Sequence, residues 1–161
     1  MTSELRQVPD TQEIFLSPES DVSVVFEVLE SVEPVDPQGA AKFHFDSLAH
    51  GNDAVPDSCV VDQVIIPTST EPINPLVLSV LHGTQLVPKF NLILPDTIKI
   101  FLAIYRVREK SIDITMVLNI PVETQNEGGA VELGGEKYKA WLSSFDVAVS
   151  SFKIVNYGLF A

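Results

Sequence analysis

The sequence contains a single cysteine, Cys59, so a disulfide cannot form within one copy of the chain. It has no apolar run near the roughly 20 residues that a membrane-spanning helix needs. The first residues show neither the basic segment nor the apolar core of a secretory signal, and no basic cluster typical of nuclear localisation is present. These absences favour a reducing compartment such as the cytosol or nucleus, and a chain of 17.6 kDa is small enough to diffuse between the two.

Basic residues are also scarce. The formal net charge is −12, and residues 1–60 account for −10 of it, because twelve acidic side chains there stand against only Arg6 and Lys42. Nucleic acids and anionic membranes are therefore poor candidate partners, since binding to phosphate groups needs positive charge. The charge alone does not separate an acidic binding surface from an aid to solubility.

Length and composition predict one globular domain covering residues 1–161. Valine-rich alternation predicts a strand at 22–29, after a loop at 17–20. A β-branched run follows later, at 59–66. Between them, apolar residues at helical spacing predict a short helix at 39–49, after a loop marked by two prolines. These prolines are Pro34 and Pro37, and the helical stripe consists of Ala40, Phe43, Phe45 and Leu48.

The second half of the chain carries a clearer sheet signal. Residues 67–81 are ambiguous because prolines interrupt them, and 84–94 predict a strand that Pro88 restricts to a sheet edge or an irregular position. Segments 98–107 and 111–122 predict two long antiparallel strands joined at 108–110. Alternation in the second of these strands predicts a single buried face. That face would hold Ile112, Ile114, Met116, Leu118 and Ile120, opposite Asp113, Thr115 and Asn119.

Beyond a polar loop at 123–135 the period changes from two to about 3.6. Residues 136–156 contain neither glycine nor proline and predict a long amphipathic helix that covers the sheet. Its apolar stripe comprises Tyr138, Trp141, Leu142, Phe145, Ala148, Val149 and Phe152. The sequence therefore predicts the α+β class, with a central antiparallel β-sheet flanked by helices.

Familiar catalytic motifs are missing. There is no glycine-rich phosphate loop, no serine elbow between glycines and no paired-histidine zinc helix. His44, His50 and His82 are far apart, and His44 and Asp46 would point to different sides of a helix. Cys59 lies in an apolar run, which favours a small buried hydrophobic residue over a nucleophile. The sequence predicts no enzymatic activity, no cofactor and no metal site.

One polar segment near the start mixes a cation with two carboxylates. Residues 5–13 read LRQVPDTQE, and Pro9 stiffens the backbone that presents the side chains after it. Taken by itself, the segment is better explained as a capped turn, with Asp10 bonded to local backbone amides and Glu13 solvated.

Residues 5–15, LRQVPDTQEIF, resemble the signature segment of the Mog family. Other stretches resemble that family in the expected order, so the resemblance spans most of the chain. They lie at 24–30, 41–48, 104–122 and 152–161. The resemblance implies the fold shared with the photosystem subunit PsbP, a central antiparallel sheet flanked by helices. Family members usually carry about one hairpin's length of chain before the signature, and that hairpin is expected to be missing from this sequence.

The resemblance also implies a function: binding the small GTPase Ran, promoting release of its guanine nucleotide and supporting nuclear protein import. The expected protein is a monomer present in the nucleus and cytoplasm. Ran binding would fall to the acidic residues of the signature, Asp10 and Glu13, with Arg6 and Gln12 as weaker neighbours. Two alternatives stay open: a PsbP-like subunit of a photosynthetic complex, and a small enzyme or small-molecule carrier that uses the concave face of the sheet.

Overall fold

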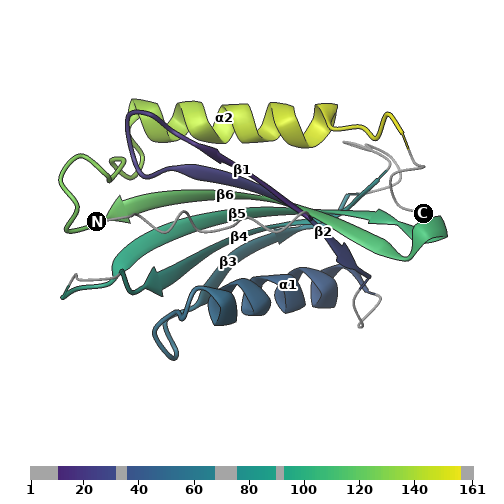
Figure 1. Cartoon of the computed structure of the whole chain (residues 1–161), viewed down its shortest axis with the longest axis horizontal. Helices are drawn as coiled ribbons and strands as arrows, with labels where there is room; N and C mark the ends of the chain where they lie inside the picture. Colours follow the sequence, from purple (N-terminus) through teal and green to yellow (C-terminus); the bar gives the residue numbers. More distant parts are fainter. Residues whose placement is uncertain (1–10, 32–35, 68–75, 90–92, 157–161) are drawn as a thin grey trace, which may run out of the picture.

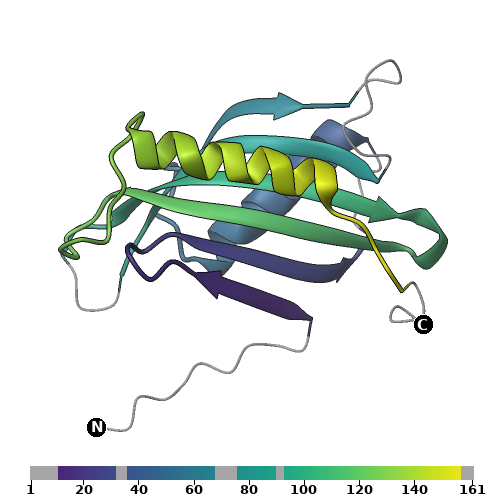
Figure 2. The same cartoon turned by 90° about the horizontal axis from the view of Figure 1, so that it is seen from above.

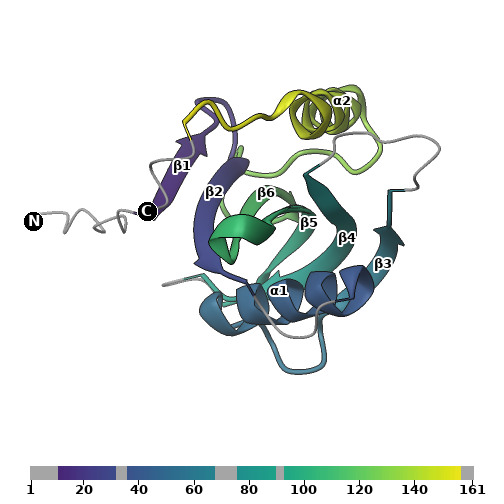
Figure 3. The ribbon, with the colours of Figure 1, turned by 90° about the vertical axis from the view of Figure 1, so that its right-hand side faces the viewer.

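The computed structural model describes residues 11–31, 36–67, 76–89 and 93–156. Within these ranges, six strands form one antiparallel sheet in the order β1-β2-β6-β5-β4-β3, and two helices lie on its opposite faces (Figures 1 and 3). This architecture confirms the predicted α+β class. The elements are β1 (Gln12–Leu16), β2 (Ser23–Glu30), α1 (Pro37–Gly51), β3 (Val60–Ile65), β4 (Val77–Val87), β5 (Asp96–Val107), the short 3-10 turn η1 (Arg108–Lys110), β6 (Ile112–Glu123) and α2 (Glu136–Ser151).

The predicted hairpin of β5 and β6 forms the centre of the sheet, but the prediction of a single buried face was wrong. One face of β6, including Met116 and Leu118, packs into a core on the side of α2. The other face is also buried, with Val117 in a second core under α1 and Asp113 and Thr115 buried beside it. Because a helix covers each side, the polar residues of this strand lie inside the protein, where each needs a partner.

Helix α1 starts earlier than predicted, because Pro37 is its first residue and does not mark a loop before it. The Asp36 carboxylate accepts a hydrogen bond from the Gly39 amide at 2.8 Å and caps the helix. Pro34, the other predicted loop marker, lies outside the described residues. The buried face also differs from the predicted stripe, since Phe43 is 45% exposed. That face consists of Ala40, Ala41, His44 and Phe45.

A glycine in β4 allows α1 to approach the sheet closely. A Cβ atom at Gly83 would lie 2.6 Å from the ring of Phe45, closer than real contacts allow. The absence of a side chain at this position therefore makes room for the aromatic ring at the centre of the α1-side core.

Strand β4 corrects the prediction made for 84–94. It begins at Val77, inside the segment left ambiguous, and ends at Val87, immediately before Pro88. It also lies between β5 and β3, so it is an internal strand. Pro88 thus ends the strand and does not mark a sheet edge, in keeping with the missing N–H of proline.

Helix α2 covers the other face and confirms the predicted amphipathic helix, although it ends at Ser151 and not near residue 156. Phe145 and Val149 are buried against the sheet. The Tyr105 hydroxyl, from β5, donates to the Val149 carbonyl at 3.1 Å, and burial raises the pKa of Tyr105 above its ordinary value. The ring of Phe152, just beyond the helix, lies 4.3 Å from that of Tyr105, so the end of α2 is fixed to the central strands.

Candidate protein-binding surface

Strand β1 places part of the signature segment at an edge of the sheet. Among the described strands it stands at one end of the order, paired only with β2. Its hydrogen-bonding groups on the far side have no described strand beside them, which makes such an edge accessible to partners. Of the four predicted binding residues, Gln12 and Glu13 open this strand, whereas Arg6 and Asp10 lie outside the described residues.

The alternation of the strand sends Gln12 and Glu13 to opposite faces of the sheet. Gln12 is opposite Glu27 of β2, on the side of α1, and Glu13 is opposite Phe26, on the side of α2. Glu13 is exposed and Gln12 is half-buried. A partner lying flat on one face cannot contact both side chains, but a partner that meets the edge of β1 can.

On the α2 side, Glu13 has aromatic neighbours. Phe15, two residues further along the same face of β1, is 54% exposed and contacts Phe26 edge to face at 6.0 Å between ring centroids. Phe26 in turn stacks on Phe152 at 6.1 Å. Phe15 and Phe26 line a groove of about 310 Å³ between the β1–β2 hairpin and α2, and Trp141 lines it from the helix. A carboxylate beside exposed aromatic rings suits recognition of a basic and apolar surface.

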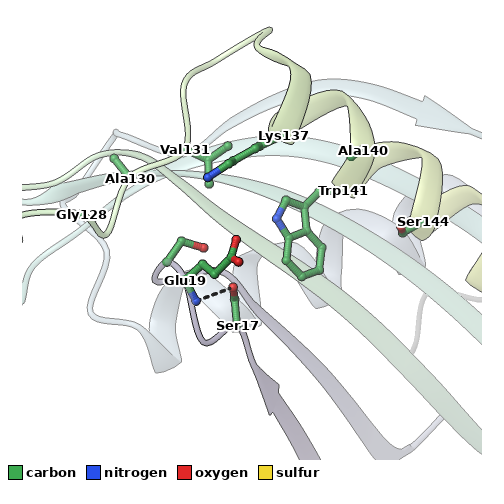
Figure 4. A pocket seen from close by; sticks show the side chains of 10 residues that line it. Ser17, Glu19, Gly128, Ala130, Val131, Lys137, Ala140, Trp141 and Ser144 are labelled. Atoms are coloured by element: carbon green, nitrogen blue, oxygen red, sulfur yellow. Dashed lines mark hydrogen bonds between the residues drawn. The ribbon is translucent and has the colours of Figure 1, made fainter.

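The groove continues toward the β1–β2 turn, where its walls become polar. There a hollow of about 290 Å³ lies between Ser17 and Glu19 of the turn and Lys137 and Trp141 of α2 (Figure 4). The Glu19 amide donates to the Ser17 hydroxyl at 3.3 Å. Trp141 and Ser144 line both hollows, so the apolar and polar hollows lie next to one another along α2.

A separate cleft lies on the α1 side. Gln12 and Glu27 line it from the hairpin, and His44 and Asn52 line it from α1 and its end, around a volume of about 340 Å³. Its walls are more polar than those of the groove beside α2, which lacks charged residues at its apolar end. Of the two predicted residues of β1, Gln12 therefore lines this cleft, whereas Glu13 lies on the α2 side and is not part of the walls of the groove there.

Beneath that cleft, a buried carboxylate joins α1 to the central hairpin. Asp113 of β6 lies 3.0 Å from His44 Nε2 and accepts from Arg106 Nε at 2.8 Å and Nη2 at 3.0 Å. Ser31 donates to the same carboxylate at 3.3 Å. Burial by itself would raise the pKa of Asp113, but the hydrogen bonds from His44 and Arg106 and their charges outweigh it and hold this pKa well below its ordinary range.

This cluster gives His44 a structural role. Asp46 is exposed on the outer side of α1, away from His44 as the spacing of the two residues predicted, and the partner of His44 is a strand residue 69 positions later. The pairing of Arg106 with Asp113 was not predicted, although both flank the predicted hairpin connection and are opposite one another across it. The hydrogen bonds from Ser31, His44 and Arg106 thus meet at one carboxylate.

Other chemical signals are weak in the part of the chain that the structure describes. No three or more His, Cys, Asp or Glu side chains there are arranged to hold a metal ion. No described helix is long and apolar enough to cross a membrane. Cys59 lies immediately before β3 and packs against the α1-side core, but it is only partly buried.

An open antiparallel sheet, a helix on each face and an exposed edge strand with acidic and aromatic side chains define an α+β domain that offers a sheet edge for recognition. The sequence profile of the family described as "Ran-interacting Mog1 protein" matches residues 2–121. The chain belongs to this family, as the resemblance of its signature segment predicted.

Individual relatives agree with this assignment. The chain is 30% identical over 161 residues to the Ran guanine nucleotide release factor of Danio rerio, with 98% of this chain and 88% of that protein covered. It is 43% identical over 53 residues to the nuclear import protein mog1 of Schizosaccharomyces pombe, with 32% and 28% covered. The crystal structure of the Saccharomyces cerevisiae Ran-binding protein Mog1p matches with a TM-score of 0.70 at 21% identity, covering 98% of this chain and 86% of that one, which supports the fold.

Proposed function

We propose that this protein binds the GTPase Ran, promotes release of its bound guanine nucleotide and thereby supports nuclear protein import. The observation that carries the proposal is the alignment of 98% of the chain with a relative named for guanine nucleotide release from Ran. The family description and the import role in the name of the fission-yeast relative support it. In this proposal the protein is a monomeric binding factor without turnover of its own, active in the nucleus and cytoplasm.

The proposed contact residues are Asp10 and Glu13, with Arg6 and Gln12 as secondary contacts. Support from the described residues comes from Glu13, an exposed carboxylate at the accessible edge of the sheet. Phe15 adds apolar area next to it, and the strongly acidic first part of the chain favours approach of a basic surface. A partner that meets the edge of β1 reaches Gln12 as well, on the other face.

Release of nucleotide follows from a difference in affinity. A factor that binds nucleotide-free Ran more tightly than loaded Ran shifts the equilibrium toward the free form by that difference, and equal affinity for both forms shifts nothing. Carboxylates supply such a difference when they bind basic groups of the GTPase that hold phosphate in its loaded form. Asp10 and Glu13 are the side chains proposed for this contact.

The test is a titration of this protein into Ran loaded with a fluorescent guanine nucleotide, at low and at physiological salt. The release rate should rise with protein concentration and reach a plateau, while the protein itself remains unchanged. Glu13→Ala should weaken the effect, and Asp46→Ala, which removes an exposed carboxylate from the outer side of α1, serves as the matched control. Absence of binding at micromolar concentrations in low salt would contradict the proposal.

A further inference from the structure

Asp96, the first residue of β5, is a buried carboxylate that has no hydrogen-bond partner among the described residues. The residue is 0% exposed, and neither of its side-chain oxygens accepts a hydrogen bond in the part of the chain that the structure describes. The nearest described cation is Lys89, whose Nζ lies 3.9 Å from Oδ2, beyond hydrogen-bond distance, on a side chain that is 44% exposed. A buried charge in this setting opposes folding, so its presence calls for a ligand that completes it.

Asp96 lines a cleft at the end of the sheet where three chain segments meet. The β1–β2 turn, the start of β5 and the end of β6 lie side by side there (Figures 1 and 2). The cleft has a volume of about 690 Å³, and its wall includes Leu16, Asp21, Lys89 and Thr124. Leu16 is the last residue of β1, so the cleft adjoins the proposed binding edge.

A second carboxylate in the cleft wall is held in place by its neighbours. Asp21 Oδ2 accepts a hydrogen bond from the Asn126 side-chain amide at 2.8 Å. It also packs directly on Gly129, where an added Cβ atom would collide with the carboxylate. The two carboxylates and Lys89 leave the cleft with a formal charge of −1, which favours a cationic ligand.

The shape of the cleft favours an organic cation over a metal ion. Its volume is far larger than a coordination sphere, and the described residues offer no group of three or more acidic, histidine or cysteine ligands there. A guanidinium ion carries five N–H donors in one plane, is weakly hydrated and pairs with carboxylates through two parallel hydrogen bonds. Asp96, whose two buried oxygens accept no hydrogen bond from the described residues, is a suitable acceptor once it is uncovered.

We propose that this cleft binds the guanidinium group of an arginine side chain presented by a protein partner. Asp96 accepts two N–H groups from it, and the exposed side chain of Leu16 covers the aliphatic part of the arginine. In the free protein the Lys89 ammonium forms a long ion pair with Asp96, at 3.9 Å, and it moves outward and uncovers the carboxylate when the arginine enters. The identity of the partner rests on the proposed function, whereas the preference for a guanidinium group does not.

The first experiment tests that preference without any protein partner. N-acetyl-arginine amide is titrated into the full chain while backbone amide resonances are followed by NMR, with N-acetyl-citrulline amide as the uncharged analogue of equal shape and N-acetyl-lysine amide as the other cation. We expect shifts at Asp96, Asp21 and Thr124 with the arginine compound and little change with citrulline. Equal shifts with citrulline would overturn the proposal.

Two variants assign the effect to the cleft. Asp96→Asn should weaken binding of the arginine compound by about tenfold or more, as expected for loss of a charge-assisted bidentate contact. Lys89→Met should strengthen it, because the competing ammonium is gone, and this second variant keeps the test decisive if the first does not fold. If Lys89 were instead a structural partner of Asp96, Lys89→Met would lower the melting temperature without any gain in binding, and the proposal would fail.

The nucleotide-release assay with Ran then separates the two proposals. Asp96→Asn should reduce the affinity for Ran by about tenfold. If the wild-type protein binds the arginine compound but not Ran, the proposed function is wrong and the cleft remains a guanidinium site. If Asp96→Asn releases nucleotide from Ran normally and the wild-type protein does not bind the arginine compound, only the cleft proposal is wrong. If the wild-type protein binds the arginine compound but Asp96→Asn acts on Ran like the wild type, the arginine that enters the cleft does not belong to Ran.

Discussion

Asp113 and Asp96 are both 0% exposed, yet their surroundings differ in almost every respect. Asp113 has partners from α1, β5 and the segment after β2, so a single carboxylate holds several elements in register. Asp96 has no hydrogen-bond partner in the described chain, and its ion pair with the partly exposed Lys89 is 3.9 Å long. Since a buried charge costs several kcal/mol unless hydrogen bonds and close ion pairs compensate it, the same residue type stabilises one region and opposes folding in the other.

Asp113→Asn should have the largest effect on stability. The substitution keeps the size of the side chain but removes the charge that Arg106 faces inside the protein. We expect the free energy of unfolding to fall by about 3–5 kcal/mol, the range for breaking one side of a buried ion pair. Urea denaturation measures it. Asp46→Asn, on the exposed side of α1, should stay within about 0.5 kcal/mol, and a comparable loss in both variants would contradict the role given to Asp113.

The stabilisation by Asp113 should also depend on pH. The folded-state pKa of Asp113 is held below its ordinary value of 3.8, so near and below that pH the unfolded chain binds a proton that the folded protein does not. The stabilisation is therefore complete above about pH 5 and is lost as the pH falls toward the folded-state pKa. Urea midpoints from pH 6 downward should fall more steeply for the wild type than for Asp113→Asn. Parallel curves would show that Asp113 carries no such linkage.

The effect of Asp96→Asn should be smaller and of opposite sign. An amide of nearly equal size replaces a charge that has no hydrogen bond, so the free energy of unfolding should rise by about 1 kcal/mol. Differential scanning calorimetry detects the accompanying increase in melting temperature. A loss of stability like that of Asp113→Asn would make Asp96 a structural residue and remove the contrast between the two aspartates.

Glu13 extends the comparison to an exposed carboxylate and should show the smallest change in stability. Glu13→Ala should alter the free energy of unfolding by less than about 0.5 kcal/mol. Its affinity for Ran should nevertheless fall by about 1–3 kcal/mol, the range for a charge-assisted contact, as measured by calorimetric titration. If stability and affinity fall by similar amounts, the segment is a local turn and not a binding element.

Periodicity predicted the parts of the fold that depend on long regular runs, the β5–β6 hairpin and α2. It did not predict the Asp113 cluster, because a connection of three residues at 108–110 would place Arg106 opposite Ile112. In the structure Ser111 joins the connection in a left-handed conformation, with φ of 53°, and the pairing moves by one residue. Arg106 then faces Asp113, and both point toward α1.

The sequence also indicated one of the candidate sites and not the other. Only the resemblance of residues 5–15 to a family signature indicated Glu13, because one exposed carboxylate has no pattern of its own. Nothing near Asp96 in the sequence indicates a site, since the other residues that line the cleft, such as Asp21 and Thr124, come from distant segments. A buried group that lacks hydrogen-bond partners can be recognised only from the three-dimensional structure.

The order of strands in the sheet has a consequence for biosynthesis. Strand β2 pairs with β6 and not with β3, and Ser23 meets Asn119 96 positions later. A ribosome adds about 5–20 residues per second, so the β1–β2 hairpin emerges several seconds before the strand that supports it. Such distant pairing also slows folding, because a long loop must close first. The nascent chain consequently carries this hairpin, with Phe15 and Phe26 in contact across it, without the central strand that it packs against, and the hairpin is a segment that a chaperone can bind during synthesis.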